Sequence, residues 1–278
     1  MQITPLTGGL GAEAQGADIR QEADFAPLFE AFKTHSVLVI RGQAEVTPED
    51  HIAFARRFGP INVNRFFKPV DGHPEIATVL KEKDQRAAVG EGWHTDHSYD
   101  EAPAMGSLLH AIEVPPYGGD TLFVSMSQAY DSLSPKMQNI LEGLSAWHSS
   151  RHVFGMAAQD SEAVRSGRLS NAEAATQDVL HPVVIKHPFS GRKSLFVNPV
   201  FTTRIDGLSA AESEVLLQML YQHCQQPELQ ARVRWQAGDI TLWDNRATWH
   251  KAINDYHGFR RYMHRITVEG CRLEGVSA

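Results

Sequence analysis

The sequence predicts a jelly-roll β-core decorated by helices, and three observations lead to that expectation. Short apolar stretches bounded by turn residues recur along the chain, as they do in β-sandwiches and barrels. The helical patterns fall mostly outside the segments that carry potential metal ligands. Those ligands, His94, Asp96 and His250, are far apart in the chain. A roll of antiparallel strands can bring an early strand pair and a late strand end together around one ion.

Composition and charge limit the class of protein. With 278 residues and 42% apolar content, the chain can bury a large core. We expect a single domain over 1–278 because no linker divides it. The net charge of -7 and the pI near 6.0 argue against nucleic acid or an anionic membrane as the main partner. Cys224 and Cys271 are too few for a disulfide framework, and no export signal or membrane-length apolar run is present, so we expect a cytoplasmic location.

The N-terminal part is predicted to alternate short strands and helices. Glycine-rich residues 3–20 indicate strands and turns, because no lysine or helix start follows as a phosphate-binding loop requires. Apolar residues at helical spacing over 25–32 predict a helix, and the apolar run over 36–40 predicts a buried strand. Residues 47–50 carry a capping pattern with proline in the first turn, so a second helix is expected to run from there to residue 59.

The middle of the chain is less regular. Residues 61–92 mix polar, aromatic and charged residues, which makes them a candidate substrate loop or, alternatively, a plain solvated connection. The turn at 115–120 feeds a strand that begins at Thr121. A helix is expected to begin after Ser134. Its predicted core face comprises Met137, Ile140, Leu141 and Leu144.

Residues 149–178 are rich in Ala, Ser, Gln, Gly and Arg and contain few large apolar residues. A stretch that polar and that long predicts a mobile lid, with a plain surface loop as the alternative. We expect Arg151, His152 and Phe154 to be its contacts with substrate.

The last third of the chain is predicted to contain a hairpin around 189–192, a helix that begins at the capping box 209–212, and strands over 232–236, 240–243 and 260–268. The expected buried face of the helix comprises Val215, Leu216, Met219 and Leu220.

His94, Asp96 and the later His250 form the pattern of two histidines and one carboxylate that binds non-haem Fe(II) and leaves positions open for a co-substrate and O₂. In an extended segment residues two apart point to the same side, so His94 and Asp96 can bind one ion. The chain has 14 histidines, and His73-Pro74-Glu75 has a similar spacing. We interpret that second match as a loop, because proline and glycine surround it.

Two arginines define the second half of the predicted site. Arg261 and Arg265 lie on one face of the strand over 260–268, about 13 Å apart at roughly 3.3 Å per residue. Two buried guanidinium groups are costly unless anions pair with them, so each is expected to receive a carboxylate or a similar group. The alternative is an exposed edge strand with surface arginines.

Several motifs follow one another in the chain: Trp93-His94-Thr95-Asp96, Gly118-Gly119-Asp120-Thr121-Leu122, Phe196-Val197-Asn198, Phe201-Thr202-Thr203-Arg204-Ile205, Trp243-Asp244-Asn245-Arg246 and Arg260-Arg261-Tyr262-Met263-His264-Arg265. Together they resemble the taurine/2-oxoglutarate dioxygenase family, which also contains 2,4-dichlorophenoxyacetate and dichlorprop dioxygenases and alkylsulfatases. The similarity spans nearly the whole chain and implies the double-stranded β-helix fold.

The resemblance implies that His94, Asp96 and His250 ligate Fe(II), and that Thr121 and Arg261 hold the distal carboxylate of 2-oxoglutarate. Arg265 would lie near the other end of this co-substrate and near the substrate anion. The implied reaction consumes O₂ and 2-oxoglutarate, releases succinate and CO₂, and hydroxylates a small anion. The aspartate at position 96 favours hydroxylation over halogenation. A homodimer or homotetramer is also implied.

The residues expected to line the substrate side differ from those that would suit taurine. The positions where the taurine enzyme presents a histidine, a tyrosine and an amine-contacting asparagine are here Asn64, Phe67 and Gly90. The ammonium group of taurine would therefore lack the asparagine partner, and an apolar substrate body would bury more surface against Phe67. Alkyl sulfonates, sulfate esters and aryloxy- or alkyl-carboxylates are the expected substrates. The full expected set is Asn64, Phe67, Gly90, His97, Phe154, Phe201 and Arg265.

Three other functions stay open from the sequence. One is taurine dioxygenase proper. A zinc hydrolase could use two histidines and an aspartate, but it would need a nearby general base and would not need the arginine pair. The third is a non-catalytic sugar-binding jelly roll, which would need neither the general base nor the arginine pair.

Overall fold

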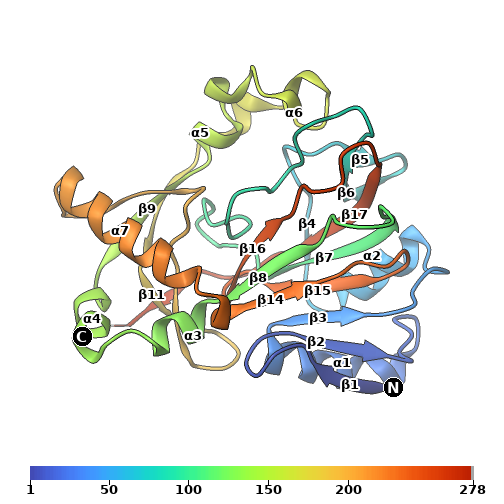
Figure 1. Cartoon of the computed structure of the whole chain (residues 1–278), viewed down its shortest axis with the longest axis horizontal. Coiled ribbons are helices and arrows are strands. Elements are labelled where there is room, and N and C mark those ends of the chain that lie inside the picture. The colour runs from blue at the N-terminus through green and yellow to red at the C-terminus, as the bar shows by residue number, and fades with distance from the viewer. Residues whose placement is uncertain (277–278) are drawn as a thin grey trace.

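The computed structural model, described over residues 1–276, is built on two antiparallel β-sheets that form the predicted jelly roll (Figure 1). One parallel pair, β2 and β3, is the exception. The larger sheet has the order β1 (Gln2–Pro5), β2 (Ala12–Gln15), β3 (Val37–Ile40), β15 (Ile240–Asp244), β7 (Gly106–Glu113), β17 (Arg261–Val268), β6 (His73–Lys81) and β5 (Pro69–Val70), with β4 (Ile61–Asn62) beside β17. The smaller sheet has the order β14 (Gln230–Val233), β8 (Thr121–Ser125) and β16 (Thr248–Ala252).

The two sheets enclose an apolar core that lies beside the candidate site. Leu109 and Met263 contribute to it from the larger sheet, and Phe123 and Val233 contribute from the smaller one. Because side chains alternate between the two faces of a strand, the neighbours of these residues along each strand point to the outer faces.

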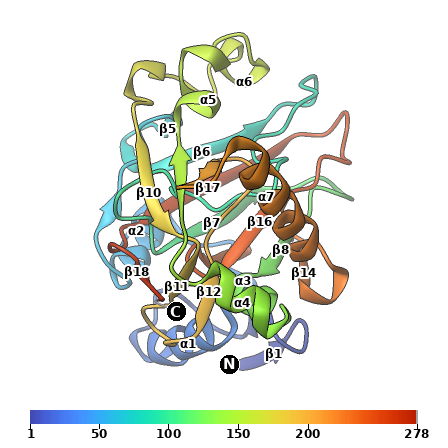
Figure 2. The ribbon, with the colours of Figure 1, turned by 90° about the vertical axis from the view of Figure 1, so that its left-hand side faces the viewer.

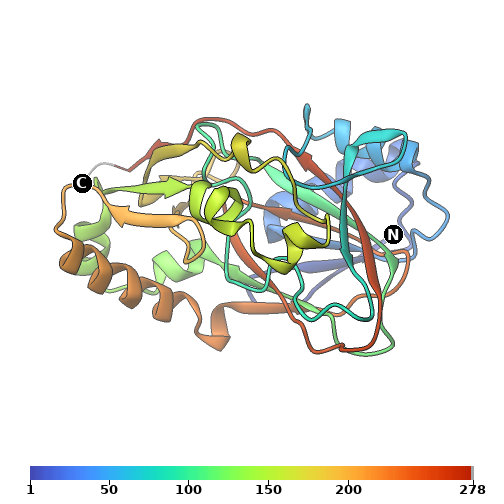
Figure 3. The ribbon, with the colours of Figure 1, turned by 90° about the horizontal axis from the view of Figure 1, so that it is seen from above.

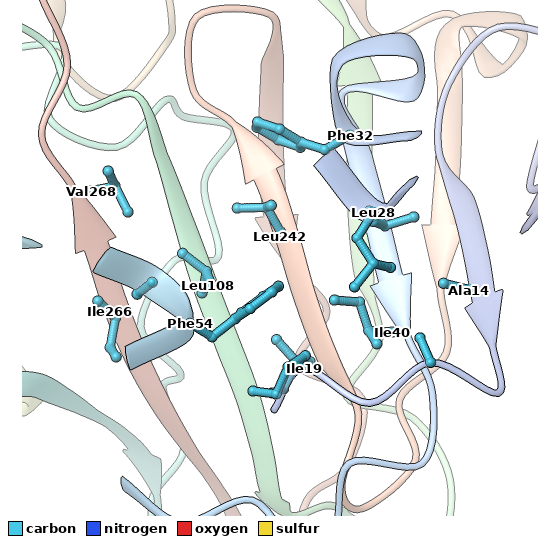
Figure 4. Packing of buried hydrophobic residues seen from close by; sticks show 14 of the residues in the cluster. Ala14, Ile19, Leu28, Phe32, Ile40, Phe54, Leu108, Leu242, Ile266 and Val268 are labelled. Carbon is cyan, nitrogen blue, oxygen red and sulfur yellow. The ribbon is translucent and has the colours of Figure 1, made fainter. Parts of the chain in front are cut away.

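Helices α1 (Glu22–His35) and α2 (Pro48–Arg56) cover the outer face of the larger sheet, as Figure 4 shows. Thr47 caps α2 through the predicted capping box with Asp50. Phe32 of α1 and Phe54 of α2 belong to one buried cluster with Leu108 and Ile266 of the sheet. This layer buries the face of the sheet that lies away from the cavity.

A second group of helices and strands forms the end of the molecule away from α1 and α2 (Figures 1 and 2). The helix predicted after Ser134 and the predicted hairpin are both present. These elements are α3 (Met126–Asp131), α4 (Pro135–Leu141), α7 (Ala210–Cys224) and η3 (Pro227–Leu229), a sheet of β10 (Asp178–Pro182), β9 (Ser145–Ser149) and β13 (Thr202–Ile205), and a sheet of β12 (Lys193–Leu195), β11 (Val184–Lys186) and β18 (Glu274–Gly275).

The buried faces expected for α4 and α7 were partly wrong. Ile140 in α4 is 55% exposed and Val215 in α7 is 72% exposed. The predicted helical period was right. Because apolar residues also occur on the solvent side of α7, periodicity alone placed its buried face about one residue from the observed one. The buried residues of α7 are Ser213, Leu217, Leu220, Tyr221 and Cys224.

The segment 149–178 crosses one end of the roll, opposite α1 and the N-terminus in Figures 1 and 2. Viewed from that end, it lies in front of the strands (Figure 3). It is not a structureless loop. It contains α5 (Arg151–Phe154), η1 (Met156–Ala158), α6 (Glu162–Arg165) and η2 (Ala172–Ala174).

The expectation that 61–92 is irregular was wrong over β6, which runs from His73 to Lys81. The His73-Pro74-Glu75 sequence is the start of this strand rather than a loop, and β6 pairs with β17 over five residues. Proline is tolerated there because it stands at the strand start. The rest of 61–92 contains only short strands, so the substrate-loop expectation now rests on the irregular stretches 63–68 and 82–92.

Within the described residues, no helix is both long enough and apolar enough to cross a membrane.

Three histidines are buried between α2 and the larger sheet. His110 and His264 are cross-strand neighbours, and His51 of α2 packs edge-on against His110 with ring centroids 5.7 Å apart. Burial, followed by the nearby His110 and His264, lowers the pKa of His51 well below its usual value. His51 therefore stays neutral in the folded protein at pH values where it is protonated in the unfolded chain.

This arrangement predicts a pH dependence of stability. Below about pH 6.5 the unfolded chain binds more protons than the folded protein, so the free energy of unfolding falls as the pH decreases from 7 to 5. His51→Leu should reduce that fall by roughly 2 kcal/mol, because one proton-binding difference is removed. Urea unfolding at both pH values measures it, with Ile52→Leu in the same helix as the control. An unchanged pH dependence in His51→Leu would contradict the assignment.

Candidate active site

The structure brings His94, Asp96 and His250 together at the junction of the two sheets. His250 lies in the middle of β16, and its backbone pairs with that of His94 through hydrogen bonds of 3.1 and 2.9 Å. The Nε2 atom of His94 lies 3.6 Å from Asp96 Oδ1, and the Nε2 atom of His250 lies 3.8 Å from Asp96 Oδ2. All three side chains are buried.

Surrounding groups fix the state of these three side chains. The Nδ1 atom of His94 lies 2.8 Å from the Gly92 carbonyl, which requires Nδ1–H and leaves the lone pair on Nε2 facing the site. Burial, followed by the nearby His94, lowers the pKa of His250 well below its usual value and keeps that ring neutral. The two imidazoles are therefore ready to act as metal ligands.

Asp96 stays ionised although it is buried. Burial tends to raise the pKa of this carboxyl, but Arg265 and then His250 outweigh burial and hold it well below its usual value. Its Oδ2 accepts a hydrogen bond of 3.0 Å from Ser107, and Arg265 Nη1 lies 3.3 Å from both carboxylate oxygens.

This set of donors fits a divalent metal ion. One atom from each of His94, Asp96 and His250 lies within 4.8 Å of the others, and no other group of this kind occurs in residues 1–276. Two neutral imidazoles and one carboxylate, with no thiolate, match the three-ligand face of non-haem Fe(II) enzymes. The other match to the spacing, at His73 and Glu75, is not part of such a group.

The turn between β15 and β16 supports His250. Asp244 accepts two hydrogen bonds of 2.9 and 2.7 Å from the Arg246 guanidinium and one of 2.9 Å from the Arg246 backbone N–H. It accepts a fourth, of 3.0 Å, from His187. Burial works against ionisation, but Arg246 and His187 hold the pKa of Asp244 well below its usual value. The residue Thr248 then donates to the Asp244 carbonyl and begins β16. An ion pair thus sets the start of the strand that carries a ligand.

Thr121 and Arg261 line the same cavity, and each begins a strand. Thr121 is the first residue of β8, and Arg261 is the first residue of β17. Both are buried, and both line the cavity that contains the three ligands. Arg261 donates from Nε to the Gly119 carbonyl at 3.1 Å but has no carboxylate within 4.0 Å among the described residues. The exposed-edge alternative for the arginines was wrong, because β17 lies inside the sheet between β6 and β7.

Arg265 lies at the centre of the site. Its guanidinium carbon is 4.4 Å from the centre of the Phe67 ring, and its Nε atom is buried without a hydrogen-bond partner. An unpaired donor of this kind is costly unless a ligand satisfies it. The guanidinium can therefore serve both the Asp96 carboxylate and a bound anion.

The cavity has a volume of about 280 Å³, and apolar side chains form most of its wall. Phe67, Phe154 and Phe201 line it, as expected from the sequence. Gly90 also lines it. A Cβ atom at Gly90 would lie 3.3 Å from the His94 ring, and its φ of +86° favours glycine. A larger side chain there would crowd the metal ligand.

Of the two polar residues His97 and Asn64, both expected to contact substrate, only His97 lines the cavity. His97 lines the cavity in a left-handed conformation (φ 58°). Its Nδ1 atom lies 2.9 Å from Asp100, which requires Nδ1–H, so its Nε2 accepts from Asn64 at 3.4 Å. Asn64 itself does not line the cavity, since its Oδ1 caps the backbone of residues 66 and 67. Its place behind His97 makes it a supporting residue.

Of the three contacts expected from the segment 149–178, only Phe154 reaches the cavity. Arg151 is exposed and binds Asp178 at 2.6 Å, while His152 binds the Val200 carbonyl at 2.6 Å. In this structure neither side chain lines the cavity, because each is held by a partner outside it.

Sequence reasoning missed several residues that form the site. Ser107 binds the ligand Asp96, and Trp235 donates to Thr121 at 3.0 Å. Trp235 and Thr121 are 114 positions apart, and Ser107 and Asp96 lie on different elements, so no local spacing could reveal these bonds. The missed apolar wall residues are Val79, Ala88, Val89, Leu109, Val153, Ala163, Leu169, Val200, Trp243 and Ala252, and Tyr99 also lines the cavity.

Residues 2–267 match the family model described as taurine catabolism dioxygenase TauD, TfdA family. The chain is 34% identical to an alkylsulfatase of Acinetobacter baylyi, over 97% of this chain and 85% of that protein. It is 37% identical to an alpha-ketoglutarate-dependent 2,4-dichlorophenoxyacetate dioxygenase of Cupriavidus pinatubonensis, over 95% and 96%. A crystal structure of AAD-2 in complex with Mn(II) and N-oxalylglycine superposes with a TM-score of 0.75 and 29% identity, covering 98% of each chain.

The ion pair beneath β16 gives a stability prediction. Asp244→Asn leaves the Arg246 guanidinium, which is only 3% exposed, without its anion, and should lower the free energy of unfolding by about 3–5 kcal/mol. Urea unfolding measures the loss. Glu101→Gln is the control, since its bond to Arg272 is exposed and should contribute under about 1 kcal/mol. Equal effects of the two substitutions would show that the buried pair does not hold the turn.

Proposed function

The chain belongs to the taurine catabolism dioxygenase TauD, TfdA family, and we propose that it hydroxylates a small, largely apolar organic anion in an Fe(II)- and 2-oxoglutarate-dependent reaction. The products are the hydroxylated substrate, succinate and CO₂. The observation that carries the proposal is that the buried His94, Asp96 and His250 open into a cavity with two buried guanidinium groups and an apolar wall.

His94, Asp96 and His250 would hold the metal ion. When bound, Fe(II) supplies the activation of O₂ and the oxidative decarboxylation of 2-oxoglutarate. The chain's own residues aim that chemistry. Gly92 and Ser107 orient two of the ligands, and the Arg265 guanidinium keeps the Asp96 carboxylate ionised.

Thr121 and Arg261 would bind the distal carboxylate of 2-oxoglutarate. A guanidinium forms its strongest contacts with carboxylates. Burial lowers the pKa of Arg261 more than Tyr256 and Asp120 raise it, so its charge is only partly compensated. A dianionic co-substrate provides that compensation. Arg265 would face the other end of the co-substrate and the anionic group of the substrate, since it lines the cavity next to Asp96.

The wall of the cavity favours an apolar substrate body. Phe67, Phe154 and Phe201 surround the space with aliphatic neighbours. The lining carboxylates are Asp96, a proposed metal ligand, and Glu91, which accepts hydrogen bonds from Ala88 N and from Asn254 at 2.9 Å. Both of these hydrogen bonds use the Oε1 atom of Glu91, so the preference for an apolar substrate body rests on the aromatic and aliphatic wall. Sulfate esters, alkyl sulfonates and aryloxy- or alkyl-carboxylates therefore fit better than taurine.

We also propose that the chain acts as one catalytic domain with 149–178 as a lid. Val153, Phe154 and Leu169 of this segment line the cavity, which supports a role in excluding water from the reaction. Arg168 ties it to the loop 82–92 through the Ala87 carbonyl at 2.8 Å. A cytoplasmic homodimer or homotetramer remains our proposal for the location and assembly.

The metal ligands give the first functional prediction. His94→Ala, Asp96→Ala and His250→Ala should each abolish turnover while the protein stays folded, because each removes a ligand and little packing. Succinate release, Mn(II) binding by calorimetry and thermal unfolding are the measurements. His73→Ala is the matched control, since His73 has the same spacing to a carboxylate but lies at the start of β6. Succinate release at the wild-type rate by any ligand variant would remove that residue from the site.

The substrate class is tested by two anions of nearly equal shape. Propane-1-sulfonate carries a methyl group where taurine carries an ammonium group. Its kcat/KM should be at least ten-fold higher than that of taurine, because burying an unpaired charge costs several kcal/mol. Longer alkyl sulfates and phenoxyacetates extend the series, with substrate-dependent succinate as the readout. If taurine were the best substrate of the series, the proposal of a largely apolar substrate body would be wrong.

A further inference from the structure

Trp235 and Thr121 form a buried hydrogen bond at the wall of the cavity. The indole Nε1 of Trp235 lies 3.0 Å from Thr121 Oγ1. Trp235 follows β14, and Thr121 begins β8, which pairs with β14 through Val233. Both residues are at least nine-tenths buried. The contact is therefore a fixed part of the sheet rather than a surface encounter.

The chemistry of the two groups determines the direction of this bond. An indole N–H is only a donor, so the Thr121 oxygen must accept from it. The hydroxyl still has one hydrogen to donate, and Thr121 Oγ1 makes no other hydrogen bond within the described residues. Thr121 lines the cavity. The indole thus sets the threonine hydroxyl as a donor that needs an acceptor in the cavity.

The same indole ring lies next to the second buried donor. The guanidinium carbon of Arg261 is 5.6 Å from the centre of the Trp235 ring. At that distance the face of an indole attracts a cation, and it does so more strongly where water is excluded. Arg261 is also held by the Gly119 carbonyl, through Nε. One side chain therefore contacts both groups of the proposed co-substrate anchor.

We infer that Trp235 is a positioning residue for 2-oxoglutarate, because it fixes the Thr121 hydroxyl as a hydrogen-bond donor and packs beside Arg261. This inference rests on the proposed function. Trp235 does not touch the co-substrate in this role. The indole N–H occupies one lone pair of the Thr121 oxygen and leaves its O–H to donate. Beside Arg261, which can only donate, this arrangement favours an acceptor such as a carboxylate.

Trp235→Phe keeps a ring in place and removes the N–H. With the Mn(II)-loaded protein, calorimetric titration of 2-oxoglutarate should show a Kd about 3- to 10-fold higher than in wild type, as expected for one buried hydrogen bond. In turnover with the Fe(II) enzyme, KM for 2-oxoglutarate should rise by a similar factor and kcat should change little. Trp235→Tyr, which also lacks the indole N–H, replaces it if the phenylalanine variant does not fold.

A double-mutant cycle separates positioning from general packing. Thr121→Val removes the hydroxyl, so adding Trp235→Phe to it should weaken 2-oxoglutarate binding by less than two-fold more. Independent, multiplying effects of the two substitutions would overturn the inference, as would unchanged 2-oxoglutarate binding by Trp235→Phe.

Arg261→Ala distinguishes the inference from its premise. If Arg261→Ala and Thr121→Val both bind 2-oxoglutarate as wild type does, the proposed anchor itself is wrong and the role of Trp235 fails with it. If those two variants bind weakly and Trp235→Phe binds normally, the anchor stands and only the inference about Trp235 is overturned.

Discussion

The site depends on one short stretch of antiparallel pairing, in which His94 and His250 exchange two backbone hydrogen bonds. His250 lies on β16, whose register with β8 places Ala252 opposite Thr121. The same ladder therefore positions His250, a proposed metal ligand, and Thr121, the first residue of the proposed co-substrate anchor. A slip of one residue would turn the His250 side chain to the other face of the sheet. The ion pair of Asp244 and Arg246 fixes the turn that precedes this strand.

Charge balance inside the roll explains why this cavity suits anions. Arg265 and Arg261 are buried on one face of β17, but among the described residues only Arg265 has a carboxylate, that of Asp96, within 4.0 Å. Burial lowers the pKa of Arg261, although Tyr256 and Asp120 act in the opposite direction, so its charged form is under-stabilised. Binding of a dianion and of an anionic substrate relieves that cost. The apolar wall around them then selects the rest of the substrate by contact area rather than by hydrogen bonds.

Local signals in the sequence predicted much of this structure. The capping box at Thr47, the ligand spacing at His94 and the shared face of the arginines depend on neighbours within a few residues. The strand β6 was missed because its proline and its terminal lysine are unusual in a buried strand, and pairing with β17 overrides that preference. The bond from Trp235 to Thr121 joins residues 114 positions apart, so only the fold reveals it.

The most direct test of the central claim is anaerobic addition of Fe(II) and then 2-oxoglutarate to the metal-free protein, followed by visible absorption spectroscopy. The account predicts a visible absorption band that requires both additions, that is lost in His250→Ala, and that needs more 2-oxoglutarate in Arg261→Ala. Tight binding of Zn(II) with no 2-oxoglutarate-dependent band after Fe(II) loading would contradict it and favour a hydrolytic site.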